Sequence, residues 1–168
     1  GLHYACRDPC GDPARACPRY GDRPRHRQIH VRMPRAHKSH RQWDRAAQAV
    51  RFADFGMCAA DEIVNQAAKN RYMFGGQGRV PIVMRMPIGM WVNSAAQHSQ
   101  SLEAWFAHMP GVVVLCPATP QDNFDMLTLA LQGDDPVVYL ENKELWTFSG
   151  EVNIDTCLPL TQARVLRR

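Results

Sequence analysis

The chain has 168 residues, of which 45% are apolar, and a formal net charge of +4. This length allows one domain of ordinary size, and no uncharged apolar run is long enough to cross a membrane. Residues 1–20 lack the apolar core of a secretory signal, and the six cysteines are irregularly spaced, so a disulfide-rich secreted scaffold is excluded and we expect a soluble, cytoplasmic protein.

The positive charge is concentrated at the start of the chain. Residues 1–50 carry 11 Lys and Arg against four Asp and no Glu, a net charge of +7, whereas residues 51–168 have a net charge of −3. Residues 1–50 also contain too few large aliphatic side chains to offset the entropy of ordering them. We therefore expect no fold in residues 1–50 and a folded domain from residue 51.

Two binding functions were considered for residues 1–50. Three cysteines and five histidines are zinc-ligand types, but the spacing C-x3-C-x6-C does not match a paired ligand frame. The arginines of residues 19–45 could neutralise nucleic-acid phosphates, but Trp43 alone provides no stacking platform. Incidental composition is the simpler interpretation, so we expect neither a zinc site nor nucleic-acid binding.

The pattern of an α/β protein begins near residue 52. Apolar residues recur with a helical period over residues 57–73, and Gly75–Gly78 ends this helix. The glycines follow a helix and precede a strand, the reverse of a phosphate-binding loop, so they predict a turn. A buried strand is expected over residues 80–86, ended by Pro87 and Gly89.

The second half of the domain continues this alternation. A short helix is expected over residues 99–108, and a β-branched run at residues 112–115 predicts a buried parallel strand. Thr119–Asp122 has the features of a helix start, the helix runs to Gly133 as its C-cap, and residues 136–140 form the next strand. The order of elements predicts an α/β fold: a partial parallel sheet with helices on both faces.

The segment at residues 87–100 is the best candidate site by position. Ligands of parallel sheets bind beyond the carboxyl ends of the strands, where this segment lies. His98 stands there among polar residues, and a neutral imidazole can accept or donate a proton near pH 7. The alternative is that His98 only caps a helix or bonds a loop. Met90 and Trp91 either line a small apolar pocket or pack in the core.

Seven segments of the chain carry a resemblance to one family. Together they resemble the beta subunit of thiamine-diphosphate-dependent 2-oxoacid dehydrogenases, and the pyruvate and acetoin dehydrogenase branches most of all. The resemblance runs from about residue 51 to residue 166. The segments are FADF (52–55), DEIVNQAAK (61–69), RYM (71–73), QHSQSLEAWF (97–106), PG (110–111), PATP (117–120) and PVVYLENK (136–143).

The resemblance implies a transketolase-like pyrimidine-binding domain at residues 51–149 and, at residues 150–168, a linker toward a C-terminal domain. In the family, the beta subunit holds the aminopyrimidine of thiamine diphosphate, and an alpha subunit holds the diphosphate and Mg²⁺. The two subunits form a heterotetramer. The cofactor's chemistry removes CO₂ from a 2-oxoacid, or cleaves acetoin, and passes the acyl unit to lipoamide on a second component. This chain has no GDG…N magnesium motif, as that division of labour requires.

The resemblance also assigns site residues. Phe55 matches the aromatic residue that packs on the aminopyrimidine ring, and His98 matches a histidine that handles the substrate and the lipoyl acceptor. Some members of the family bind a structural K⁺ through backbone carbonyls. The matching positions are Ile82, Ala130, Gly133 and Asp135.

The chain departs from the family pattern upstream of Phe52. The carboxylic acid that activates the aminopyrimidine belongs there to an Ile-Ser-Glu-like motif, and residues 1–50 contain no Glu. We consider two hypotheses for residues 1–50, a disordered segment and an out-of-frame translation, and we expect the chain to be a fragment of a longer subunit. Two functions remain open: an enzyme subunit, or a catalytically inactive fragment that at most associates with other subunits.

Overall fold

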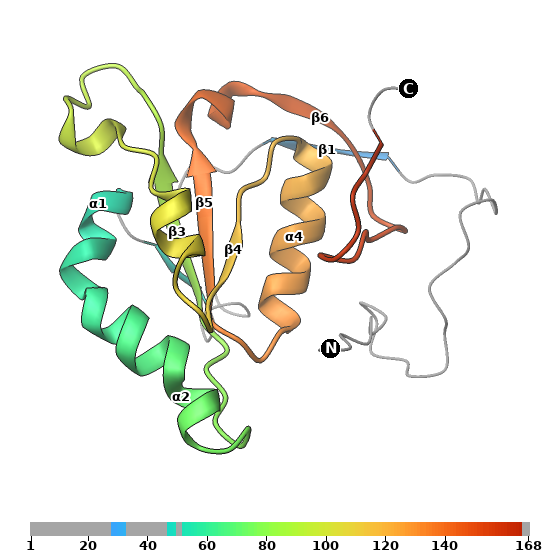
Figure 1. Ribbon diagram of the computed structural model, residues 1–168. Helices are drawn as coiled ribbons and strands as arrows, with labels where there is room; N and C mark the ends of the chain where they lie inside the picture. The colour runs from blue at the N-terminus through green and yellow to red at the C-terminus, as the bar shows by residue number, and fades with distance from the viewer. Residues whose placement is uncertain (1–27, 33–46, 50–51, 166–168) are drawn as a thin grey trace.

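A parallel β-sheet forms the centre of the protein (Figure 1). The computed structural model describes residues 28–32, 47–49 and 52–165. Within them, the strands of this sheet pair in the order β2-β3-β5-β4, all in parallel, which confirms the predicted sheet. The strands are β2 (Ala47–Ala49), β3 (Val83–Ile88), β4 (Val113–Leu115) and β5 (Val137–Asn142).

Two further strands form a small sheet of their own. β1 (Gln28–Arg32) pairs antiparallel with β6 (Ser149–Asn153). β1 and β2 lie within residues 1–50, where composition led us to expect no fold. They are strands because their backbones pair with the distant β6 and β3, and such pairing leaves no mark on local composition. The two hypotheses for residues 1–50 and the divisions at 51–149 and 150–168 stay predictions.

A long helical run precedes β3. The run begins at Ala53, earlier than the helix predicted over residues 57–73, and ends at Met73. Gly75 and Gly76 then take positive φ angles of 61° and 86°, so the glycine-rich stretch begins as the expected turn. The run consists of α1 (Ala53–Gly56), the 3₁₀ turn η1 (Met57–Ala59), the π-helical η2 (Glu62–Ala67) and α2 (Ala68–Met73).

The strand β3 lies further along the chain than predicted. We expected it over residues 80–86, but the N–H of Ile82 donates to the carbonyl of Val80 at 2.8 Å, a local turn that delays the strand. The strand also passes through Pro87. β2 flanks β3 only as far as Arg85, so beyond Arg85 the described sheet has one neighbour for β3, and a proline is tolerated there.

The helix α3 is shorter than predicted. A single 3₁₀ turn, η3 (Gln97–Ser99), is separated from α3 (Glu103–Ala107) by residues 100–102, and the backbone of Gln100 is extended. The carbonyl of Gln100 accepts a hydrogen bond from the N–H of Gly89 at 3.1 Å. This contact with the end of β3 replaces the first turn of the helix that we expected over residues 99–108.

The helix α4 (Pro120–Gln132) begins where the sequence predicts. The Thr119 hydroxyl accepts a hydrogen bond from the N–H of Asp122 at 3.1 Å, and the Asp122 carboxylate accepts one from the N–H of Thr119 at 3.1 Å. This reciprocal capping box satisfies two backbone donors of the first turn. Gly133 is the C-cap as expected, in an extended conformation.

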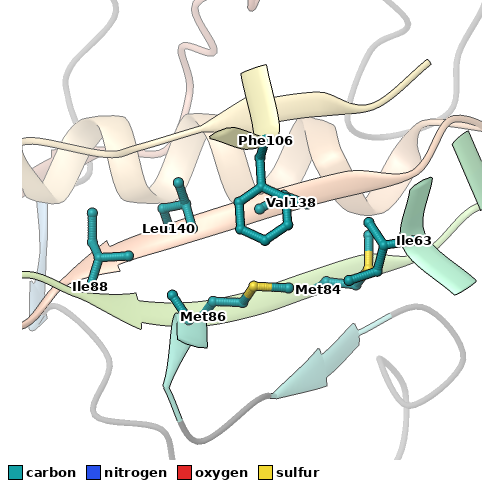
Figure 2. Packing of buried hydrophobic residues seen from close by; sticks show 8 residues of the cluster. Ile63, Met84, Met86, Ile88, Phe106, Val138 and Leu140 are labelled. Carbon is teal, nitrogen blue, oxygen red and sulfur yellow. The ribbon is translucent and has the colours of Figure 1, made fainter. Parts of the chain in front are cut away.

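Each face of the sheet has its own apolar core. Figure 2 shows the first, in which residues of β3 and β5 pack against Phe106 of α3 and Ile63 of η2. On the opposite face, Tyr139 and its neighbours pack against α4. Helices therefore cover both faces, as predicted (Figure 1). The buried residues of the first core are Ala53, Ile63, Met84, Met86, Ile88, Phe106, Val138 and Leu140.

After β5 the chain returns over α4. The 3₁₀ segment η4 (Lys143–Thr147) leads into β6, and the guanidinium of Arg164 then forms ion pairs with Asp122 at 3.2 Å and Asp125 at 3.0 Å. Among the described helices, none combines the length and apolar character needed to cross a membrane.

Candidate functional site at the carboxyl edge of the sheet

The segment between β3 and α3 is anchored at the carboxyl edge of the sheet. β3 ends at Ile88, and Gly89 follows it with a φ of 78° that suits glycine. A Cβ at this position would lie 2.9 Å from the side-chain oxygen of Asn142. The bond from Gly89 to Gln100 closes the intervening loop. His98 is thereby held near the ends of β3 and β5, in the region that the sequence indicated.

The imidazole of His98 is bound to a carboxylate from a distant part of the chain. Its Nδ1 lies 3.0 Å from Oδ2 and 3.2 Å from Oδ1 of Asp54, which belongs to the first turn of α1. The exposed fractions of the two side chains are 33% for His98 and 17% for Asp54. The pair is therefore partly shielded from solvent, and the imidazole remains partly exposed.

Two aromatic rings pack beside this imidazole. The ring of Phe52 stacks on the imidazole with centroids 4.3 Å apart and an interplanar angle of 9°. The ring of Phe55 lies 5.5 Å from the imidazole at 30°, and Phe55 remains 44% exposed. Phe55 therefore remains partly exposed next to His98, so the structure brings these two predicted site residues together.

The ammonium group of Lys143 is buried next to His98 and Phe52. Lys143 is fully buried, its Nζ donates to the backbone carbonyl of His98, and it lies 5.0 Å from the centroid of the Phe52 ring. Burial lowers the pKa of Lys143 below its ordinary value, and the nearby Asp54 carboxylate opposes this change. The carbonyl, the ring face and the carboxylate together compensate for burying a charge.

An apolar pocket lies close to the same loop. Its volume is about 440 Å³, and it is lined by Met90, Trp91, Val92 and Glu144. The indole of Trp91 packs against that of Trp146 with centroids 6.1 Å apart. Met90 and Val92 are largely exposed, so this stretch forms a pocket and does not pack in the core.

The four residues predicted to bind K⁺ lie at the opposite, amino edge of the sheet. The carbonyl of Ile82 accepts a hydrogen bond from the N–H of Val137 at 2.9 Å, and that of Ala130 accepts one from Gly133 at 3.3 Å. The Asp135 carboxylate pairs with Arg71 at 2.9 Å. These residues gather around the end of α4 and the start of β5, where helix-terminal carbonyls favour a cation. The K⁺ site stays a prediction.

Sequence reasoning missed two polar members of the site, Asp54 and Lys143. Both stand in segments that carry the resemblance, yet only Phe55 and His98 received roles. An acid in the first turn of a helix is usually explained by the helix dipole, and a lysine after a strand is usually exposed. The partners of Asp54 and Lys143 lie 44 and 45 residues away, so no local spacing indicates them.

The described residues contain no candidate metal centre made of His, Cys, Asp or Glu side chains. Within residues 28–32, 47–49 and 52–165, no group of three His, Cys, Asp or Glu is placed to hold a metal ion. Cys6, Cys10 and Cys17, considered above for zinc, lie outside the described residues. Most of the arginine-rich stretch at residues 19–45 lies outside them too.

The fold is an α/β domain, and its candidate site, at the carboxyl edge of the parallel sheet, is made of two aromatic rings and an imidazole. The family described as "Transketolase, pyrimidine binding domain" matches residues 40–147, more than half of the chain. The chain belongs to this family. This match begins at residue 40, ahead of the resemblance in the sequence, which starts at about residue 51.

Relatives of the chain are beta subunits. It is 44% identical over 117 residues to the acetoin:2,6-dichlorophenolindophenol oxidoreductase subunit beta of Cupriavidus necator, covering 69% of this chain and 35% of that one. It is 45% identical over 116 residues to the pyruvate dehydrogenase E1 component subunit beta of Rhizobium meliloti, covering 68% and 25%. The mitochondrial pyruvate dehydrogenase E1 component subunit beta-1 of Oryza sativa is 44% identical over 117 residues, covering 67% and 31%. The chain spans about a third or less of the length of these relatives.

Proposed function

We propose that this chain is the pyrimidine-binding part of a beta subunit in a thiamine-diphosphate-dependent dehydrogenase component. The component acts on pyruvate, another 2-oxoacid or acetoin and transfers the acyl unit to lipoamide. The observation that carries the proposal is the exposed ring of Phe55 beside the His98–Asp54 pair, at the edge where parallel sheets bind ligands. The names of the relatives, which are subunits acting on pyruvate and acetoin, support the substrate class.

The aromatic part of the site suits thiamine diphosphate. An aminopyrimidine is a flat ring, and we propose the partly exposed ring of Phe55 as its offset-stacking partner. When bound, the cofactor supplies a nucleophilic carbon that cleaves the bond next to a carbonyl group. The carboxylates of Asp54 and Glu141 are already paired with His98 and Arg85, respectively.

His98 is the residue that we assign to proton transfer with the substrate. Its imidazole is partly exposed at the ligand edge, and a neutral imidazole can accept a proton and return it near pH 7. Phe52 and Phe55 shield one side of the ring from water. This arrangement holds the imidazole in place, which favours transfer at one position on the substrate.

The proposal includes partners that hold the rest of the site. An alpha subunit provides the binding groups for the diphosphate and Mg²⁺, and a lipoyl-bearing second component receives the acyl unit. A structural K⁺ at the amino edge is part of the same proposal, with the carbonyls named above as its ligands.

One observation favours a second function. The acid that the family uses to activate the aminopyrimidine is expected within residues 1–50, and those residues contain no Glu. A chain that binds the ring without activating it would be a catalytically inactive fragment that associates with other subunits. The two functions differ in turnover and not in assembly.

A reconstitution separates the two functions. The full chain is mixed with the alpha subunit of a similar enzyme, thiamine diphosphate, Mg²⁺ and 2,6-dichlorophenolindophenol as the electron acceptor. CO₂ release from pyruvate or acetaldehyde release from acetoin is then followed. We expect turnover that falls at least about 100-fold in His98→Ala, because general acid–base catalysis contributes that much or more. His108→Ala, a change at an exposed histidine, serves as the control and retains turnover. Assembly without turnover in the parent chain would instead establish the inactive fragment.

A further inference from the structure

We propose that Asp54 is a positioning residue that fixes the His98 imidazole in the tautomer with the proton on Nδ1, so that Nε2 is the proton acceptor at the ligand edge. The inference rests on the proposed role of His98 in proton transfer. It adds which nitrogen acts and which residue selects it.

The hydrogen bond between the two side chains determines where the proton lies. Nδ1 of His98 is within 3.2 Å of both carboxylate oxygens of Asp54. A carboxylate only accepts hydrogen bonds, so Nδ1 must donate. A neutral imidazole has one N–H, which leaves a lone pair on Nε2. No hydrogen bond joins Nε2 to another residue in the described part of the chain, so this lone pair is available to a ligand.

The stacking and main-chain contacts of His98 cannot make this selection. Phe52 stacks on the ring at an interplanar angle of 9°, which fixes the plane of the imidazole. A half-turn about the Cβ–Cγ bond would return the ring to the same plane with Nδ1 exchanged for a ring carbon, and would leave the stacking unchanged. Lys143 binds the backbone carbonyl of His98, which fixes the main chain and not the ring. Among the described residues that contact His98, only Asp54 distinguishes one orientation and one protonated nitrogen from the other.

The simpler explanation of Asp54 is that it stabilises the start of α1. The structure does not support a capping role, because the N-cap of α1 is Phe52 and no side chain caps that end. Both carboxylate oxygens of Asp54 instead face the ring of His98. The Asp54 side chain is only 17% exposed, so water competes weakly for this bond.

The tautomer can be measured directly on the full chain labelled with ¹⁵N-histidine. Two-bond ¹H–¹⁵N correlation distinguishes the tautomers, and the His98 signals are those missing from His98→Gln. We expect the Nδ1–H tautomer in the parent chain and its loss in Asp54→Ala, because free imidazole favours the other tautomer. Asp61→Ala removes an exposed acid from the same helical run and should leave the tautomer unchanged. A parent chain with the His98 proton on Nε2 would overturn the inference, and that outcome does not depend on whether Asp54→Ala folds.

A second measurement asks whether Asp54 acts through His98. In the reconstituted enzyme, Asp54→Ala should lower kcat about 10- to 100-fold, the usual cost of removing a supporting residue. In the His98→Ala background the same change should have no further effect, whereas a general structural role would lower kcat again. Full additivity of the two changes would contradict the inference. An inactive parent chain with the Nδ1–H tautomer would refute the proposed function and leave the positioning role standing.

Discussion

Tyr139 is a buried phenol at the centre of β5. Its side chain is fully buried, and its hydroxyl donates toward Asn123, 2.9 Å from the side-chain oxygen and 3.2 Å from the carbonyl oxygen. Burial raises the pKa of Tyr139 well above its ordinary value of 10.0, and the charge of Glu141 adds to this rise. The folded protein therefore keeps the phenol protonated at pH values where the unfolded chain ionises it.

This difference predicts a pH-dependent stability. A group whose pKa is higher in the folded state stabilises the fold below the unfolded pKa and loses that contribution as pH rises above it. Above pH 10, Tyr139 should lower the free energy of unfolding by about 1.4 kcal/mol per pH unit. Tyr139→Phe should cost about 1–3 kcal/mol at pH 7, because Asn123 loses its partner, and should lack this decline.

Urea unfolding of both proteins at pH 7, 9, 10 and 11 checks the prediction. The stability difference between parent and variant should be constant up to pH 9 and should shrink above pH 10. The comparison cancels the titration of other groups, including Lys143, which both proteins share. A difference that stays the same at pH 11 would show that the phenol ionises in the folded protein.

The candidate site shows which residues a sequence can and cannot indicate. His98 was predicted because it follows a strand and stands among polar residues at the expected ligand edge. Phe55 was predicted from the FADF segment, through the resemblance. Asp54 and Lys143 were not, since their function depends on contacts more than 40 residues away along the chain. The sheet brings these distant segments together in space, and no local spacing in the sequence indicates such contacts.

The N-terminal capping box of α4 gives a prediction at the scale of one element. Thr119→Ala removes the oxygen that accepts from the N–H of Asp122, so it should lower the free energy of unfolding by about 1 kcal/mol. Thr119→Ser keeps that oxygen and serves as the control, with a much smaller effect. Urea unfolding followed by circular dichroism measures both. Equal losses in the two variants would assign the effect to the lost methyl group instead.

Elements with local signals could be predicted, and those fixed by tertiary contacts could not. Thr119, Pro120 and Asp122 specify the start of α4 without reference to the rest of the fold. The start of α3 is different, because Gln100 has no local reason to be extended until its carbonyl meets Gly89. β2 pairs with β3 from a segment whose composition predicts no strand at all.

At the scale of the whole molecule, the described domain leaves apolar side chains uncovered. Tyr72, Met73 and Phe74 are consecutive at the end of α2, and their exposed fractions are 88%, 69% and 60%. Contiguous exposed apolar side chains of this kind favour association with another protein surface. Burying them in an assembly would remove this surface from water.

We therefore predict that the full chain associates with itself when no partner is present. Its elution volume in size-exclusion chromatography should decrease as its concentration rises, and its thermal midpoint should depend on concentration. The double variant Tyr72→Ser/Phe74→Ser replaces the two aromatic residues at the end of α2. It should weaken this association because it removes most of the apolar area that Tyr72, Met73 and Phe74 expose. Phe148→Ser changes an exposed aromatic residue at another place and should not. A monomer with a sharp, concentration-independent melt would contradict the prediction, since the exposed side chains would then carry no association.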